Sequence, residues 1–573
     1  MKRIILYTII LLSTQQLCFA QIKISGRVLS ADRNSSLSGA TIKVKGRSTA
    51  VSTDTSGRFN LVLTPAERTF TVSYIGYQMK DVQVNGKPET ELLVFLEPSL
   101  TSLSEVLVST GYQDIPAERS TGSFTLIDNK TFNQQVSTDI LSRLEAVANG
   151  VTVDRTTNAS GRLMIRGLST IRGSKEPLIV LDNFPYEGDI NNINPNDVQS
   201  ITILKDAAAS SVWGARAGNG VIVITTKKGQ FNQPLQIDFN TSISVNQKPD
   251  LSYIPQISSS EYINVEQMLY SKGFYNSQIN ANTKPALSPV IELLIQKSAG
   301  SISASEADAR INALRQVNVR DEFNTYLYQQ GVKQQYSGSA KGGSENSAWN
   351  LSAGLDKNVD VLNAGFDRVN LHFRQSLTPV KNLRMMAGIY YTLSKGTGGR
   401  PGYGSISSFS GNLYPYAQFA DADGMALPII KDYRQGYLSQ AGNGQLLDWK
   451  YYPLEEYKNV RNITSSQDMI ANVDVGYQVF KGLAAGIKYQ YERQEGEGRN
   501  QLGIDSYTAR NLINLYTQIN PATGQITYAI PKGGILDLSN GSLQSHNLRS
   551  QLTFNRTWKD HSISSLAGGE LRQ

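Results

Sequence analysis

Side chains that could carry out catalysis are scarce in this sequence of 573 residues. It holds three histidines, His372, His546 and His561, without the spacing of a metal motif, and it has no nucleophile elbow. The acidic pair Glu455–Glu456 fits a solvated loop better than a pair of glycosidase carboxylates. Because no catalytic constellation can be assembled, we expect a protein that is not an enzyme and that uses no cofactor and no bound metal.

Two glycine-containing stretches could in principle bind a ligand. GARAGNG, residues 214–220, has neither the dinucleotide-binding nor the phosphate-loop spacing, and its glycines follow a short alanine-rich helix instead of preceding one. TDTSGRF, residues 53–59, has too few carboxylates for a calcium loop. Both are predicted to be structural turns, the second one capped by Asp54.

The N-terminus predicts export. Residues 1–20 combine a basic start, an apolar run from Ile4 to Leu12 and small residues near Ala20, as a secretory signal peptide does. The apolar run is too short for a transmembrane anchor. Cys18 lies before the expected cleavage site, which argues against a lipoprotein, and its removal with the leader leaves a mature chain without disulfides or thiol chemistry.

The rest of the sequence points to β structure. It has no apolar run of about 18 residues, so residence in a membrane would have to use strands. The 48 glycines and 28 tyrosines suit a turn-rich β protein. The formal charge of +7 falls to +5 when Lys2 and Arg3 leave with the leader (7 − 2 = 5), and the basic residues are scattered. This distribution gives no support to nucleic acid as a partner.

Four regions follow the leader. Short alternating runs between turn residues predict a β-sandwich over residues 21–98. Residues 99–119 form a linker whose centre, 105–108, is able to form a strand. That strand could belong to the sandwich, or it could add to the sheet edge of another protein. Residues 120–230 predict a mixed α/β unit, and residues 231–573 consist of alternating strands.

The mixed α/β unit carries clear local signals. Ser137–Asp139 can cap an amphipathic helix. Asp206 can cap a second, alanine-rich helix that Gly214 would end. The run Val221–Thr226 is apolar on both faces, which predicts a strand buried on both sides.

The C-terminal region predicts an outer-membrane type of β-barrel. We expect strands of about 10–14 residues, the length that spans a membrane when tilted, at 235–247, 333–342, 347–358, 367–378, 382–395, 467–479, 483–494, 545–557 and 562–573. Short turns alternate with long loops, which a soluble β-sandwich would not require. Aromatic residues near the strand ends predict a girdle at the membrane surface: Tyr390, Tyr391, Phe480, Tyr489, Tyr491 and Trp558.

Nine strands cannot close a barrel of this type. An open sheet in lipid would leave unpaired backbone groups at two edges, each costing several kcal/mol. We therefore expect this sequence to be the N-terminal part of a longer protein or the product of a truncated gene, and not to form a working pore alone.

Two motifs in the α/β unit resemble one family, the SusC/RagA-like TonB-dependent outer-membrane transporters of the Bacteroidetes type. These are LMIRGLSTIRGSKEPLIVLDNFPY (163–186) and INPNDVQSITILKDAAASSVWGARAGNGVIVITTKKG (193–229). The departures from the family pattern are Asn183–Phe184, Trp213 and Gly218. The resemblance implies a mainly β protein: an N-terminal carboxypeptidase-regulatory-like β-sandwich, an α/β plug domain and an antiparallel transmembrane β-barrel, here with about nine of ~22 strands.

The resemblance also assigns residues. LSEVLVSTGY is similar to the TonB box, so the residues that contact TonB would be Leu103, Ser104, Glu105, Val106, Leu107 and Val108. The plug residues that match the family pattern, and that would act in structure or gating, are Arg166, Gly167, Asp182, Pro195, Asp197, Lys205, Asp206, Gly214, Arg216, Asn219 and Gly220.

The function that the resemblance implies is active import of a glycan or peptide oligomer across the outer membrane. TonB, energised by ExbB and ExbD, would pull on the plug, and a SusD-like surface lipoprotein would capture the oligosaccharide or peptide. The barrel would contact outer-membrane lipid, with the sandwich and plug on the periplasmic side. Two alternatives remain: a signal transducer, which usually carries an extra βαβ domain, and a non-transporting adhesion protein.

Overall fold

The computed structural model describes residues 22–31, 35–45, 49–64, 67–84, 91–97, 107–116, 122–154, 161–167, 172, 175–408, 411–558 and 561–573. The chain divides into two compact units, which we describe separately. Residues 1–107 and 116–119 form one unit, and residues 108–115 and 120–573 form the other. The expected signal peptide, 1–20, lies outside the described residues.

The first unit contains the predicted β-sandwich. Its strands are β1 (Ile22–Ser30), β2 (Thr41–Val44), β3 (Ala50–Ser52), β4 (Arg58–Leu63), β5 (Thr69–Ser73), β6 (Lys80–Gln83) and β7 (Leu92–Leu96). They form one sheet in the order β4-β1-β7 and another in the order β3-β2-β5-β6. Alternate residues of β4 are buried, as a two-layer sandwich requires. The Asp54 carboxylate accepts hydrogen bonds from the backbone N–H groups of Ser56 (2.8 Å) and Arg58 (2.9 Å), so 53–59 is the expected Asp-capped turn.

The second unit begins with the plug, a mixed sheet with short helices. Its elements are β10 (Phe124–Asp128), α2 (Asn129–Phe132), α3 (Ile140–Val147), β11 (Val151–Asp154), β12 (Arg162–Ile165), β13 (Leu178–Leu181), β14 (Phe184–Pro185), η2 (Ile190–Asn192), η3 (Pro195–Asp197), β15 (Val198–Leu204), α4 (Ala207–Ser210), η4 (Ser211–Ala217) and β16 (Val221–Thr226). The main sheet has the order β10-β15-β16-β13-β14. β16 lies between two neighbours and is buried along nearly its whole length, as its apolar run predicts.

Helix caps set the local geometry of the plug. Asp139 accepts a hydrogen bond from the Ser142 N–H (2.7 Å) at the start of α3, and Asp206 accepts one from the Ala209 N–H (2.8 Å) at the start of α4. Both caps agree with the sequence prediction. The second helix is shorter than expected: α4 ends at Ser210 and continues as the irregular turn η4, in which Gly214 has a φ of 63°.

A nine-stranded antiparallel sheet follows, and it contains every strand that the sequence predicts. The strands are β17 (Gln236–Asn246), β18 (Gly331–Gly343), β19 (Ser347–Val359), β20 (Gly365–Val380), β21 (Leu383–Thr397), β22 (Val460–Phe480), β23 (Leu483–Leu502), β26 (Ile535–Trp558) and β27 (His561–Arg572). Each strand pairs with the next strand of this list, and β23 pairs with β26. The predicted length was wrong for β22, β23 and β26, which have 21, 20 and 24 residues, because ladder pairing continues into polar sequence beyond the apolar stretch.

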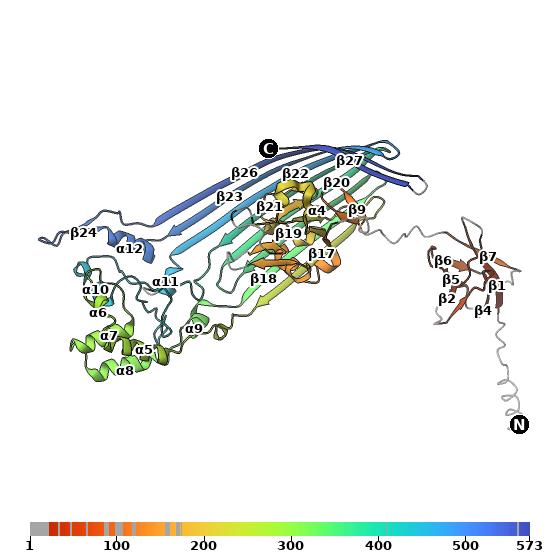
Figure 1. Ribbon diagram of the computed structural model, residues 1–573. Coiled ribbons are helices and arrows are strands. Elements are labelled where there is room, and N and C mark those ends of the chain that lie inside the picture. Colours follow the sequence, from red (N-terminus) through yellow and green to blue (C-terminus); the bar gives the residue numbers. More distant parts are fainter. Residues whose placement is uncertain are drawn as a thin grey trace, which may run out of the picture. The chain divides into compact units, whose positions relative to one another are not determined.

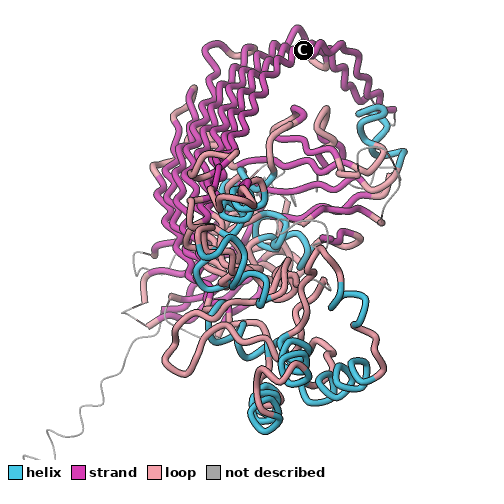
Figure 2. The backbone as a smooth tube through the Cα atoms, turned by 90° about the vertical axis from the view of Figure 1, so that its left-hand side faces the viewer, coloured by secondary structure: helices cyan, strands magenta, loops and turns pink. Residues whose placement is uncertain are grey.

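In this sheet the apolar face is exposed and the polar face is buried, the opposite of a soluble β-sandwich. On β20, Val369, Leu371 and Phe373 are exposed, whereas the alternating Arg368 and Arg374 are buried. The buried polar face meets the plug, which lies on the inner side of the curved sheet (Figures 1 and 2). An apolar outer face and a polar inner face are typical of a transmembrane barrel wall. Among the described residues, no helix is long and apolar enough to cross a membrane.

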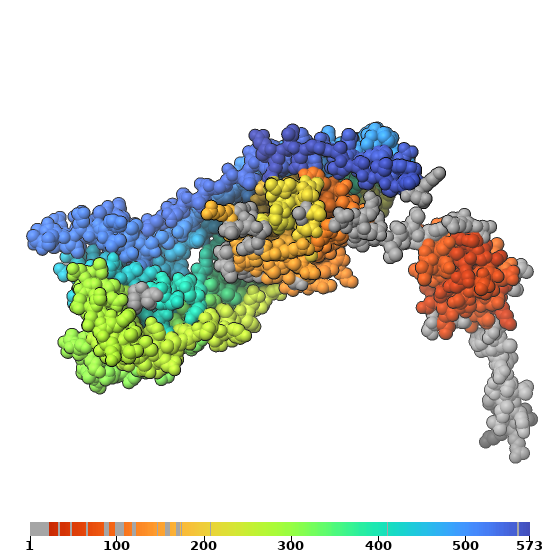
Figure 3. Space-filling view, in the orientation of Figure 1, coloured from red at the N-terminus to blue at the C-terminus, as the bar shows by residue number. Residues whose placement is uncertain are grey.

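The long connections gather at one end of the sheet, where they form a helical layer (Figure 1). Their helices are η5 (Leu251–Tyr253), α5 (Ser259–Ser271), α6 (Asn276–Asn280), α7 (Pro289–Ser298), α8 (Ala304–Leu314), α9 (Val319–Glu322), η6 (Phe323–Leu327), α10 (Gln435–Gln440), η7 (Ala441–Gly444), α11 (Pro453–Glu456) and α12 (Tyr507–Leu515), with the hairpin β24 (Thr517–Ile519) and β25 (Ile526–Tyr528). Residues from all three long connections share one aromatic-rich core that includes Phe323, Phe419 and Tyr507. Figure 3 shows the green and cyan loop segments as one continuous mass.

Candidate functional site

Three buried arginines of the sheet hold the plug. Arg368 and Arg374 lie on β20, and Arg549 lies on β26; their residues are 1%, 2% and 2% exposed. All three project from the inner face and reach the plug or the segment that leads into it. A buried guanidinium is stable only when its charge and N–H groups are matched, so these contacts mark where the two parts are coupled.

Arg374 pairs with Asp182 of the plug. Their charged atoms are 2.8 Å apart, and the two side chains are 3% and 1% exposed. The Asp182 carboxylate also accepts hydrogen bonds from the Thr226 backbone N–H (3.0 Å), from the Thr226 hydroxyl (2.6 Å) and from the Tyr390 hydroxyl. Tyr390 therefore points inward from β21, and the prediction that it belongs to a membrane-surface girdle was wrong.

The charge on Asp182 is stabilised where it is buried. Burial by itself would raise the pKa of this carboxyl, but the charges of Arg374 and Lys228 and the hydrogen bonds from Thr226 hold the pKa well below its ordinary value of 3.8. The residue begins a tight turn with a φ of 46°, followed by Asn183 with a φ of 81°. Asp and Asn tolerate this left-handed conformation, which explains how Asn183 fits at a departure from the family pattern.

Arg368 anchors a second part of the plug. It pairs with Asp356 of β19 at 2.7 Å and donates hydrogen bonds to the carbonyls of Thr138 (2.7 Å) and Asn191. Asn370, two residues along β20, donates to the carbonyl of Asn192 at 2.9 Å. The start of α3 and the turn η2 are therefore tied to the same strand that carries Arg374.

Seven of the predicted plug residues gather around one cleft of about 550 Å³. They are Arg166, Gly167, Lys205, Asp206, Gly214, Asn219 and Gly220. The Gly220 φ is +88°, and an added Cβ would lie 2.8 Å from Ile165. Arg166 donates a hydrogen bond to the Ser123 hydroxyl (2.7 Å), and Asn219 donates one to the Glu176 carbonyl (3.2 Å). These hydrogen bonds stabilise the turns of the plug. A role of these residues in gating stays a prediction.

The other four predicted plug residues lie elsewhere. Asp182, Pro195 and Asp197 are buried. Burial raises the pKa of Asp197, opposite to the direction for Asp182. Arg216 pairs with Glu187, which also pairs with Arg572 of β27.

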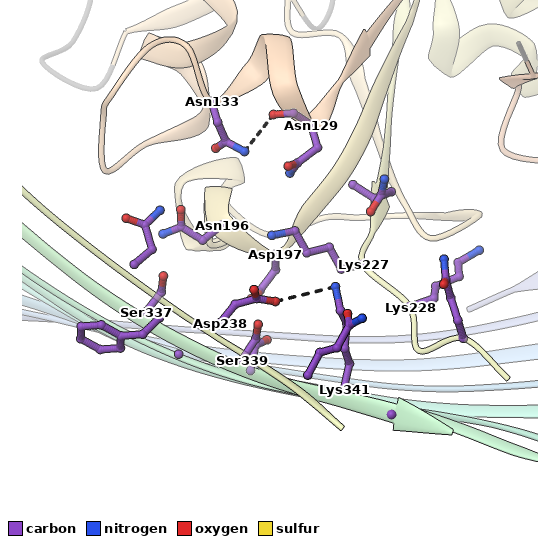
Figure 4. A pocket seen from close by; sticks show the side chains of 18 of the residues that line it. Asn129, Asn133, Asn196, Asp197, Lys227, Lys228, Asp238, Ser337, Ser339 and Lys341 are labelled. Atoms are coloured by element: carbon purple, nitrogen blue, oxygen red, sulfur yellow. Dashed lines mark hydrogen bonds and ion pairs between the residues drawn. The ribbon is translucent and has the colours of Figure 1, made fainter. Parts of the chain in front are cut away.

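A polar cleft of about 480 Å³ separates part of the plug from β17 and β18 (Figure 4). Amide, hydroxyl and charged side chains line it from both sides: Asn129, Asn133, Asn196, Asp197 and Lys227 from the plug, and Asp238, Ser337, Ser339 and Lys341 from the sheet. When polar surfaces separate, water replaces their hydrogen bonds at a small cost in free energy. Separating an apolar interface would cost more, because apolar area becomes exposed to water. This side of the interface is therefore suited to movement.

The segment predicted to contact TonB lies mostly outside the described residues, which exclude Leu103, Ser104, Glu105 and Val106. Leu107 and Val108 begin β8 (Leu107–Ser109), the first strand of a small hairpin completed by β9 (Asp114–Pro116). The role of Leu103–Val108 stays a prediction. Sequence reasoning missed the wall arginines, although DRVNLHFRQ, residues 367–375, places cations on the polar face of an alternating strand.

Comparison with known proteins agrees with this architecture. The CarboxypepD_reg-like domain family matches residues 24–108, and the TonB-dependent Receptor Plug Domain family matches residues 116–221. TonB-dependent receptor SusC of Bacteroides thetaiotaomicron is 26% identical over 543 residues, which cover 87% of this chain and 48% of that protein. TonB-dependent receptor P39 of Formosa agariphila is 28% identical over 362 residues, which cover 62% of this chain and 31% of that protein. The chain thus spans about half or less of the length of these relatives.

Solved structures share the fold. The RagAB peptide importer in its open-open state aligns with a TM-score of 0.59 at 18% identity, covering 81% of this chain and 48% of that one. Its closed-closed state gives 0.57 at 19% identity, covering 78% and 47%. The sandwich, the plug and the nine-stranded antiparallel sheet agree with these matches and confirm the predicted fold class. The chain therefore contains a CarboxypepD_reg-like domain and a TonB-dependent receptor plug domain, and it is similar to SusC and other TonB-dependent receptors, in agreement with the resemblance of its motifs.

Proposed function

We propose that this chain belongs to an outer-membrane importer that uses TonB to move a nutrient oligomer past its plug. The observation that carries the proposal is the plug on the polar inner face of the sheet, held there by the buried Arg374–Asp182 pair and by hydrogen bonds from Arg368 to plug carbonyls. A domain that occupies the inner side of a barrel wall blocks diffusion, so passage requires it to move. The outer membrane has no ATP, and the energy must therefore arrive mechanically from the periplasm.

The contact with TonB is assigned to Leu103–Val108. A strand-forming segment can add to a sheet edge through main-chain hydrogen bonds and can then transmit a pull along its length. The chain leads from this segment through the hairpin β8–β9 into the plug, so a pull on Leu103–Val108 would load the plug directly. ExbB and ExbD would energise TonB.

The long connections support capture at the outer end. They form a continuous layer around a shared core, with large exposed side chains such as Tyr253 (91%) and Phe274 (63%). A SusD-like surface lipoprotein would close over this layer and hold an oligosaccharide or a peptide. The strands-only sandwich, with no helix among its described residues, favours an importer over a signal transducer, which would carry a βαβ domain.

Backbone pairing to TonB is tested by substitutions in the full-length protein. Val106→Pro removes one N–H donor and fixes the backbone, so we expect uptake of labelled oligomer to be abolished. Val106→Ala keeps the main-chain pairing and serves as the matched control, which should retain most of the uptake. Deleting Leu103–Val108 should also abolish uptake while membrane insertion stays normal. Normal uptake by the deletion variant contradicts coupling through this segment.

A further inference from the structure

The hairpin that follows the proposed TonB contact is built into the plug and the sheet. Residues 108–115 group with the second unit, whereas the residues on either side group with the sandwich unit. Val108 is 1% exposed. The Thr110 N–H donates to the Gln113 carbonyl at 3.0 Å and closes the turn. The first residues to receive a pull from Leu103–Val108 are therefore docked.

The plug contacts the hairpin through Trp213. Its indole N–H donates to the Thr110 carbonyl at 2.9 Å, and its ring centroid lies 4.5 Å from that of Tyr112. Gly111 has a φ of +83°, and an added Cβ would lie 2.6 Å from the Trp213 ring. This explains a departure from the family pattern, because tyrosine at position 213 would lack the indole N–H that reaches Thr110.

The sheet contacts the hairpin through Arg549 and Glu570, and the Arg549 guanidinium also lies 5.4 Å from the Trp213 ring centroid. The Arg549 guanidinium lies 3.8 Å from the Tyr112 ring centroid and donates to the Gly111 carbonyl at 3.1 Å. Its charge is paired with Glu570 of β27 at 2.9 Å, and the Tyr112 hydroxyl donates to the same carboxylate at 2.8 Å. Burial, together with this hydrogen bond, raises the pKa of Tyr112 to about 12, so the phenol remains a donor at neutral pH.

We propose that the Arg549–Glu570 pair is a latch that holds the hairpin 108–115 against the barrel wall, and that Trp213 passes the pull to the plug once the latch opens. The proposal rests on the proposed function, because it takes the pull to arrive through Leu103–Val108. Arg549 and Glu570 act here as positioning residues that fix the hairpin.

The contacts of the hairpin with the sheet and with the plug are expected to respond differently to a pull. The latch joins the hairpin to β26 and β27, strands whose backbones are paired along their length. Its hydrogen bonds and cation–π contact act over short distances and are lost after a small displacement. Trp213 belongs to η4, whose Gly214 has a φ of 63° and which leads to β16 in the middle of the plug sheet. A pull that frees the hairpin from the wall therefore loads the central strand of the plug.

The test measures undocking of the hairpin directly. Val108→Cys is introduced into the full-length protein in lipid, with any other accessible cysteine of the mature protein replaced, and its reaction with a maleimide is timed. Arg549→Lys keeps the charge but loses the flat guanidinium over Tyr112 and one hydrogen bond. Arg556→Lys, at an exposed position of the same strand, is the matched control.

We expect labelling at least about tenfold faster in Arg549→Lys than in Arg556→Lys, which corresponds to roughly 1.4 kcal/mol. Equal labelling rates in the two variants overturn the latch. If Arg549→Lys fails to assemble, Tyr112→Phe replaces it, because this variant removes only the hydroxyl that bonds to Glu570; it should label faster than the parent, and an unchanged rate refutes the proposal. The labelling needs no transport, so failure of the importer proposal shows in the uptake assay and not here.

Discussion

Replacing Asp182 by asparagine is expected to free the plug from the barrel wall. Asparagine has the same size and tolerates the left-handed φ of 46° at this position, so the backbone gains little strain. What changes is the charge opposite Arg374, whose side chain is 3% exposed. Removing one partner of a buried ion pair leaves an uncompensated charge and typically costs about 3–5 kcal/mol.

This destabilisation should lower the free energy needed to open the plug, because Asp182 also accepts hydrogen bonds from Thr226 at the end of the central strand β16. Hydrogen exchange followed by mass spectrometry on the full-length protein measures this opening. We expect amides of 178–186 and 221–228 to exchange roughly 10²- to 5 × 10³-fold faster in Asp182→Asn, the ratio that about 3–5 kcal/mol produces. Asp189→Asn, an exposed cap in the same plug that keeps its acceptor oxygen, is the control.

The same pair predicts a pH dependence. Since the folded-state pKa of Asp182 is held below its ordinary value of 3.8, its stabilisation is fully present above that value and is lost as pH falls through the folded-state pKa. The contribution of Asp182 to protection of the plug amides, measured as the difference between the parent and Asp182→Asn, should therefore be steady from neutral pH down to about pH 5 and should fall in stronger acid. Equal exchange in Asp182→Asn and Asp189→Asn at neutral pH would refute the reasoning that the buried pair holds the plug.

Three further substitutions test other parts of the structure. Gly111→Ala should loosen the hairpin by about 2–4 kcal/mol from backbone strain and overpacking, whereas Gly167→Ala, which has open space, should cost only the backbone strain; thermal unfolding of the purified protein compares them. Phe419→Ala should destabilise the loop layer by about 3–5 kcal/mol, and Tyr253→Ala, 91% exposed, should not, as limited proteolysis of the loops will show. Leu371→Arg on the outer face should reduce membrane assembly by about 2–4 kcal/mol, measured by folding into lipid vesicles.

Local signals in the sequence were sufficient to place the nine strands and the helix caps of the plug, but not the ends of the longest strands or the helices of the long connections. Alternation placed all nine strands of the sheet, because successive side chains of a strand point to opposite faces. Asp139 and Asp206 marked helix starts because an N-cap bonds to backbone only three residues away. The apolar run Val221–Thr226 predicted the buried central strand of the plug sheet.

The contacts that hold the plug depended on pairs far apart in the chain. Arg374 meets Asp182 across 192 residues, and Arg549 meets Gly111 across 438. Alternation shows that Arg374 faces inward, but the same pattern would fit a water-filled channel. Tyr390 was misplaced for the same reason, since an aromatic residue on a strand can face lipid or plug.

The sequence by itself determined where the strands, caps and turns lie, since these depend on neighbours within a few positions, whereas cross-strand pairing set the ends of the longest strands. Only the tertiary structure decided what the inner face of the sheet touches and that three long loops share one core. It also showed that the hairpin 108–115 is held by both the plug and the sheet. The physical reason is that burial makes the contacts of an arginine costly to break, and burial is a property of the assembled fold.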